Sequence, residues 1–110
     1  MRIDGPPVLP ADWSALAPEE HSGETGTSMW RTIESGAVRT RIVEFSAGFR
    51  QDHWCPRGHI LLVLDGDLTL ELRDGACVPL APGSGFMLGD DEAHPHIARS
   101  ERGARVFIVD

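Results

Sequence analysis

The chain has 110 residues, 41% of them hydrophobic, and a formal net charge of -7 from 10 basic and 17 acidic residues. This is the length of one domain with a single core, and the composition is not that of a disordered chain. The acidic balance argues against nucleic acid and anionic membrane surfaces as partners, and no apolar run approaches the roughly 18 residues of a membrane helix. Two cysteines make no disulfide framework and the proline-broken N-terminus does not resemble a signal peptide, so we expect a reduced, cytoplasmic protein.

Residues 1–26 are expected to form an irregular N-terminal arm. The segment is rich in Pro, Gly, Ser and acidic residues, and its prolines exclude a long helix. The pattern predicts one short helical turn over residues 11–16, capped by Asp12. Trp13 is expected to anchor the arm on the domain, and the alternative is a disordered tail.

Residues 27–110 show the pattern of an all-β domain. Short runs rich in Val, Ile, Leu, Phe and Thr alternate with Gly, Pro and Asp, which favours a sandwich or barrel. The expected strands are Ser28 to Glu34, Val38 to Phe45, Phe49 to Trp54, His59 to Asp65, Leu68 to Leu72, Ala76 to Leu80, Ser84 to Leu88, His96 to Arg99 and Arg105 to Val109. The side chains expected in the core or lining the barrel are Trp30, Phe45, Phe49, Cys77, Phe86, Met87 and Phe107.

Three possible metal ligands lie close together in the sequence. On a strand, positions i and i+2 share a face, so His53 and Cys55 are expected to project together. The segment 55–58 predicts a turn, after which His59 opens the next strand beside them. Imidazole and thiolate donors suit zinc, iron, nickel or copper rather than magnesium or calcium. The alternative is that Cys55 is only a small buried hydrophobic residue.

A second group of imidazoles follows downstream. His94 and His96 flank Pro95 at the start of an expected strand, and either would supply a fourth donor from a distant part of a barrel. The alternative is that they are exposed loop histidines beside the acidic residues at 90–92.

These residues resemble the two motifs of the cupin superfamily. In the first motif, Gly48, His53, Cys55, His59 and Gly66 stand at the family spacing. In the second, Gly75 and Pro82-Gly83 precede a histidine, for which the spacing allows His94 or His96, and we favour His96. The resemblance implies a small jelly-roll barrel, also described as a double-stranded β-helix, with one divalent metal ion held by His53, Cys55, His59 and one of the two downstream histidines.

The chain is also similar, over nearly its whole length, to a group of small single-domain cupins labelled by a DHCW motif. The matching stretches are residues 20–26, 30–32, 52–55, 58–59, 64–66 and 107–110. Two departures from the general cupin pattern matter, because Cys55 replaces the second histidine and His59 replaces the acidic ligand. This softer ligand set favours zinc, with iron, nickel or copper as alternatives.

The sequence therefore predicts a small metal-binding barrel that binds or transforms a small polar molecule, and it leaves open whether the protein is an enzyme. The alternatives are a metal-free barrel that binds a small molecule and a structural zinc site without catalysis. Arg50 and Arg57 flank the expected site and would either meet an anionic ligand or lie solvated at its rim. We also expect a homodimer, by analogy with small cupins that pair through edge strands.

Overall fold

The computed structural model describes residues 1–110 and consists of strands and one short 3-10 helix. In chain order the elements are η1 (Trp13–Ala15), β1 (Glu19–Ser22), β2 (Thr27–Ser35), β3 (Val38–Phe45), β4 (Phe49–Arg50), β5 (Ile60–Gly66), β6 (Leu68–Leu72), β7 (Cys77–Leu80), β8 (Gly85–Met87), β9 (His96–Ser100) and β10 (Ala104–Val109). No helix is long and apolar enough to cross a membrane.

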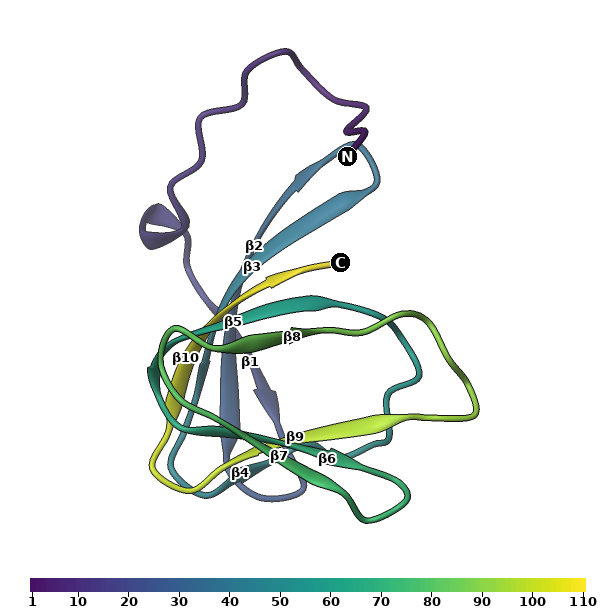
Figure 1. The fold of residues 1–110 in the computed structure, drawn as a ribbon. Helices are drawn as coiled ribbons and strands as arrows, with labels where there is room; N and C mark the ends of the chain where they lie inside the picture. The colour runs from purple at the N-terminus through teal and green to yellow at the C-terminus, as the bar shows by residue number, and fades with distance from the viewer.

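The strands form two antiparallel sheets. One has six strands in the order β1-β2-β3-β10-β5-β8, and the other has four in the order β4-β9-β6-β7. Figure 1 shows that β5 and β8 of the first sheet lie across from β6, β7 and β9 of the second, and that the β2–β3 hairpin extends well beyond the barrel. The expectation of an all-β barrel is confirmed.

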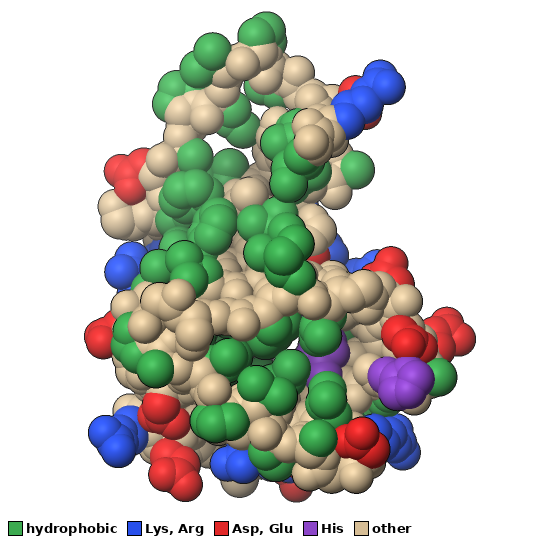
Figure 2. Space-filling view, viewed as in Figure 1, with side chains coloured by type: hydrophobic (Ala, Val, Ile, Leu, Met, Phe, Trp, Pro, Cys, Tyr) green, Lys and Arg blue, Asp and Glu red, His purple; other side chains and the backbone are tan.

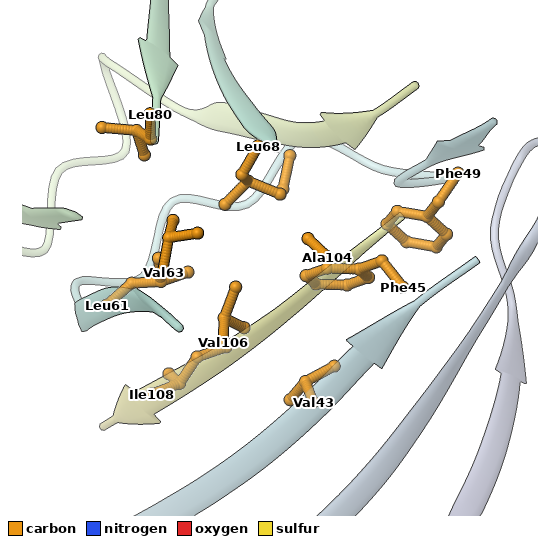
Figure 3. Close-up of a cluster of buried hydrophobic side chains, with 11 residues drawn as sticks. Val43, Phe45, Phe49, Leu61, Val63, Leu68, Leu80, Ala104, Val106 and Ile108 are labelled. Carbon is orange, nitrogen blue, oxygen red and sulfur yellow. The ribbon is translucent and has the colours of Figure 1, made fainter. Parts of the chain in front are cut away.

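The core lies between the sheets and follows from the alternation of side chains along the strands. Val43 on β3, Val63 on β5 and Val106 on β10 are fully buried. Figure 3 shows these side chains pointing toward one another, with Leu68 and Leu80 closing the cluster from the opposite sheet. Because neighbouring strands are held in register, each contributes its inward residues to one continuous apolar interior.

The N-terminal arm is fixed to the barrel near the β2–β3 hairpin. Asp12 accepts a hydrogen bond from the backbone of Ser14 at 3.0 Å and caps η1, as expected. The indole of Trp13 donates to the carbonyl of Thr40 at 3.1 Å and meets the ring of Phe107 edge to face. The predicted anchoring role of Trp13 is therefore confirmed. Figure 1 shows the N-terminus beside the hairpin tip.

The arm also contains a strand that the sequence pattern did not predict. β1 pairs with β2, from Glu19 opposite Trp30 to Ser22 opposite Thr27. All four of its side chains are exposed, so it has no apolar alternation by which to recognise a strand. Pairing of the backbone, and not burial of side chains, holds it in place.

The expected strand from Phe49 to Trp54 is wrong beyond Arg50. The side-chain oxygen of Gln51 accepts a hydrogen bond from the backbone amide of Ala98 at 3.1 Å, which takes the place of a backbone carbonyl in the ladder. Arg50 pairs with Arg99 and Cys55 pairs with His96. The chain therefore advances five residues on this segment while it advances only three on β9. The extra residues bulge outward. His53 and Cys55 therefore do not lie side by side on a regular strand.

Three expected interior residues lie outside the core. Phe107 is only partly buried, and its ring packs against Trp13 of the arm on the outer face of β10. Cys77 is exposed, and Met87 is 77% exposed. Both stand on edge strands, β7 and β8, where no further strand and no covering segment shields them.

Candidate metal centre and cavity

The inner face of the six-stranded sheet changes from apolar to polar at one end. On β3 the inward positions run from Phe45 and Val43 to Arg41 and Arg39. On β10 the same alternation ends at Asp110, whose backbone pairs with Arg39 through hydrogen bonds of 2.8 and 2.9 Å. The polar ends of adjacent strands thus meet at one level because the strands are in register.

Strand β5 adds the first imidazole at that level. His59 immediately precedes β5 and lies two residues before the buried Leu61, so it shares the inward face. Its backbone carbonyl accepts a hydrogen bond from Leu88 at 2.9 Å, which ties the residue to the segment after β8. The predicted position of His59 at the start of a strand therefore brings it to the cavity wall.

Cys55, His59 and His96 form a compact group of possible ligands. Their donor atoms all lie within 4.8 Å of one another. Nε2 of His59 is 3.1 Å from Nε2 of His96 and 3.9 Å from Sγ of Cys55. Reciprocal backbone hydrogen bonds of 2.9 and 3.0 Å between Cys55 and His96 fix two of the three residues relative to each other.

Two of the three donor separations in the group are close to the spacing around a tetrahedral metal ion. Two ligand atoms that are each about 2.0–2.3 Å from zinc lie roughly 3.3–3.8 Å apart. The distances of 3.1 and 3.9 Å bracket that range. Two ring nitrogens facing each other at 3.1 Å also require a shared proton or a shared cation between them. The donor set therefore fits a zinc-like ion.

A carboxylate lies near the other side of the His59 ring. Nδ1 of His59 is buried without a hydrogen-bond partner and lies 3.7 Å from Oδ2 of Asp110. A proton on this nitrogen, facing the carboxylate, leaves the lone pair on Nε2, toward Cys55 and His96. Burial lowers the pKa of His59, and the nearby Asp110 opposes this shift. The neutral imidazole is the form that binds a metal ion.

His96 is the most strongly perturbed histidine. His96 is only 4% exposed, and its ring lies against the rings of Phe86 and His59. Burial, followed by the charges of His59 and His53, lowers its pKa to about 4. Its side chain is therefore neutral at physiological pH, with a lone pair available for a ligand.

His53 and His94 stand outside this group. His53 sits in the bulge, 67% exposed at its side chain, with Nδ1 2.7 Å from a carboxylate oxygen of Asp52. It still lines the cavity described below. His94 is 76% exposed, and its Nδ1 lies 2.7 Å from the carboxylate of Asp91. Of the two downstream histidines, His96 is thus the one that faces Cys55 and His59.

The three possible ligands open onto a cavity of about 280 Å³ inside the barrel. One part of its wall is apolar and comprises Trp30, Phe45, Phe49, Leu61, Phe86, Ala98 and Ile108. The other part is polar and contains the possible ligands with Arg39, Arg41, Arg57, Asp52, Asp110 and His53. Figure 2 shows histidine and hydrophobic side chains together on the barrel face below the arm.

Only one of the two arginines that the sequence placed beside the site lines the cavity. Arg57 lines it, but Arg50 lies elsewhere and pairs with Glu71 at 2.7 Å and Glu24 at 3.1 Å. Arg39 and Arg41 were not among the site residues predicted from the sequence. Their alternation with Val43 and Phe45 on one strand was the signal that would have placed them on the inward face.

Sequence comparisons gave no match. No family model matches the chain, and no curated protein matches it.

Comparison with solved structures gave many matches at the level of the fold. The polyketide cyclase RemF from Streptomyces resistomycificus superposes with a TM-score of 0.76 at 20% identity, over 93% of this chain and 78% of that one. A sugar phosphate isomerase from Silicibacter pomeroyi, described as from a cupin superfamily, superposes with a TM-score of 0.70 at 13% identity, over 92% of this chain and 74% of that one. A cupin-like protein from Thermotoga maritima gives 0.69 at 20% identity, over 86% and 76%. The chain has the fold of the cupin superfamily, and identities this low show the fold alone.

Proposed function

We propose that this cupin-fold barrel binds one divalent transition metal ion through Cys55, His59 and His96, and that its cavity holds a small polar molecule next to that ion. The single observation that supports this most is the convergence of one sulfur and two ring nitrogens within 4.8 Å on a cavity wall. Of the candidate ions, zinc suits this thiolate and imidazole set best, and iron, nickel or copper are the alternatives.

His53 is the candidate for a fourth protein ligand, because it lines the same cavity. Its exposed position in the bulge would require a change of side-chain conformation to reach the other three donors. Three protein ligands leave a coordination position for a small molecule, as in catalytic zinc sites, whereas four would close the site. His94 is not part of the proposed site.

The chain's own residues prepare this site for a metal ion. Burial favours the neutral forms of His59 and His96, and the Asp110 carboxylate lies 3.7 Å from Nδ1 of His59. When bound, such an ion supplies Lewis-acid polarisation of an oxygen atom of the neighbouring molecule. The apolar part of the wall excludes water from that molecule. Cytoplasmic location and a homodimeric state stay predictions from the sequence.

The test is elemental analysis of protein purified without an affinity tag, for wild type and single variants. We expect near-stoichiometric metal in wild type and loss of metal in Cys55→Ala and His59→Ala. Cys77→Ala and His94→Ala are matched controls, since both side chains are exposed and outside the group, and both should retain the metal.

Spectra of the cobalt-substituted protein add the identity of the ligands, because a thiolate ligand gives a charge-transfer band that nitrogen and oxygen ligands do not. The band should be present in wild type and Cys77→Ala and absent in Cys55→Ala. Metal that is absent from wild type, or unaffected by the change at Cys55 or at His59, would sink the proposed function.

A further inference from the structure

The cavity has a cationic wall, although the protein as a whole is acidic. The chain has a net charge of -7, yet the cavity is lined by three arginines and only two carboxylates. One of those carboxylates, Asp52, is engaged by His53 at 2.7 Å. Of the two carboxylates that line the cavity, only Asp110 lies within 4 Å of its arginines, while the charge of Glu34 acts on Arg41 from outside the cavity. A pocket with this imbalance attracts a small anion into an otherwise negative protein.

Arg41 is the one of these arginines with a buried nitrogen that lacks a hydrogen-bond partner. Its Nε is buried without a hydrogen-bond partner, and Oδ1 of Asp110 is 3.8 Å away, beyond hydrogen-bonding range. That same oxygen accepts a hydrogen bond from Arg39 at 3.1 Å. A buried N–H group that lacks a partner is costly, and an oxyanion that accepts from Nε and a terminal nitrogen of the same guanidinium removes this cost. The carboxylate oxygen nearest Arg41 is thus already bonded to Arg39.

The position of Arg41 is fixed by its surroundings. Its guanidinium lies 5.1 Å from the ring centroid of Trp30, a cation–π contact. The indole nitrogen of Trp30 donates to Ser28 at 2.8 Å, which holds the ring in place. Trp30 and Arg41 both line the cavity, so the aromatic ring and the charge form one surface.

We infer that the cavity binds a small organic carboxylate, with its carboxylate group on Arg41 and its apolar body against the aromatic part of the wall. The aromatic residues Trp30, Phe45 and Phe86 favour a body with an apolar face. A flat carboxylate matches the planar fork of a guanidinium better than a spherical anion does. This inference deepens the proposed function and rests on its cavity, although it does not require the metal ion.

The test compares benzoate with benzamide, its uncharged analogue of similar shape, on chelator-treated protein. The readout is the set of indole N–H resonances, because Trp30 lines the cavity whereas Trp13 and Trp54 do not. Benzoate should shift the Trp30 signal and leave the other two in place, with an affinity at least about tenfold higher than that of benzamide. Equal affinities of the two probes, or no shift of Trp30 with benzoate, would overturn the inference.

Variants distinguish the role of Arg41 in benzoate binding from a general effect of positive charge. Arg41→Met should reduce benzoate affinity about tenfold or more and leave benzamide unchanged, whereas Arg41→Lys should retain part of the binding. Arg105→Gln is the matched control, since this exposed arginine lies outside the cavity, and it should bind benzoate like wild type. If Arg41→Met does not fold, Arg41→Lys and the two probes on wild type still decide the matter.

The same probes distinguish this inference from the metal proposal. Cys55→Ala, expected to lose the metal ion, should still bind benzoate through Arg41. Benzoate binding in a protein that takes up no metal would support the anion site and refute the metal site. Metal uptake by a protein that binds benzoate and benzamide with equal affinity would support the metal site and refute the anion site.

Discussion

The stability of the metal-free protein should fall steeply in mildly acidic solution, mainly because of His96. Its pKa is about 4 in the folded protein against 6.5 for an unperturbed histidine. Above the unfolded value both states hold a neutral ring, so His96 has no effect on the free energy of unfolding. At pH values below the unfolded pKa, His96 binds a proton in the unfolded chain but not in the folded protein. Stability therefore decreases as the pH falls toward the folded pKa.

The size of this loss follows from the difference between the two pKa values. The full loss corresponds to about 3 kcal/mol, reached below pH 4, and about 2 kcal/mol is already lost at about pH 5. His59 acts in the same direction, because burial lowers its pKa as well. The carboxylates with lowered pKa values, Asp52, Glu71 and Asp91, lose their contributions only near and below their own ordinary values of 3.8 to 4.5. The interval above about pH 5 therefore isolates the histidines.

Urea unfolding followed by tryptophan fluorescence, in the presence of a chelator, measures this dependence. His96→Gln should remove most of the loss between about pH 7 and pH 5. His94→Gln should keep the wild-type slope, since His94 is exposed and outside the group. Parallel curves for wild type and His96→Gln would refute the reasoning. If His96→Gln does not fold, the imidazole C–H resonance of His96 in wild type should titrate near the lowered pKa, and a midpoint near 6.5 would contradict the argument.

Three further predictions concern the core, a turn and the orientation of His59. Leu68→Ala should lower the free energy of unfolding by about 2–5 kcal/mol because Leu68 is 1% exposed. Leu62→Ala should lower it by only about 1 kcal/mol because Leu62 is 40% exposed. Equal losses for the two variants in urea unfolding would contradict this. Asp67→Ala should cost about 1–2 kcal/mol in the same assay, since its carboxylate accepts from two backbone amides, and more than Asp74→Ala, which removes one such bond. Asp110→Asn should weaken zinc binding about tenfold in a chelator competition titration, and an unchanged affinity would show that this carboxylate does not support His59.

Period-two alternation and turn residues were enough to predict most of the barrel. Residues 38–45 and 68–72 form strands β3 and β6 with the expected bounds. The Asp74-Gly75 pair forms the turn between β6 and β7, where Gly75 has a positive φ of 96° that favours glycine. In these segments local chemistry and burial agree, so the sequence alone determines the structure.

The bulge at residues 51–54 shows where this approach fails. The sequence analysis predicts a strand over residues 49–54, but the side chain of Gln51 competes for the backbone amide of Ala98 and ends the ladder. That competition depends on a residue 47 positions away and cannot be read from local periodicity. As a result the sequence placed His53 beside Cys55, whereas the structure turns it toward the exposed rim.

The cavity could be predicted in parts but not as a whole. The spacing of Cys55 and His59 and the position of His96 indicated three of its residues. Arg41 and Asp110 could have been placed on inward faces by alternation alone, but their meeting with His59 depends on the register of three strands that are distant in sequence. Register between strands is set by the packing of the whole sheet.

The two proposed binding groups share one residue, and this links their chemistry. Asp110 lies 3.7 Å from Nδ1 of His59 and 3.8 Å from Nε of Arg41. It cannot compensate both groups fully, since Arg39 already donates to one of its oxygens. The charge of Arg41 also disfavours a positive charge at His59, so an organic carboxylate bound on Arg41 would offset that charge and favour a cation at His59. Benzoate should therefore raise the affinity for zinc, and zinc should raise the affinity for benzoate by the same factor, because such coupling is reciprocal.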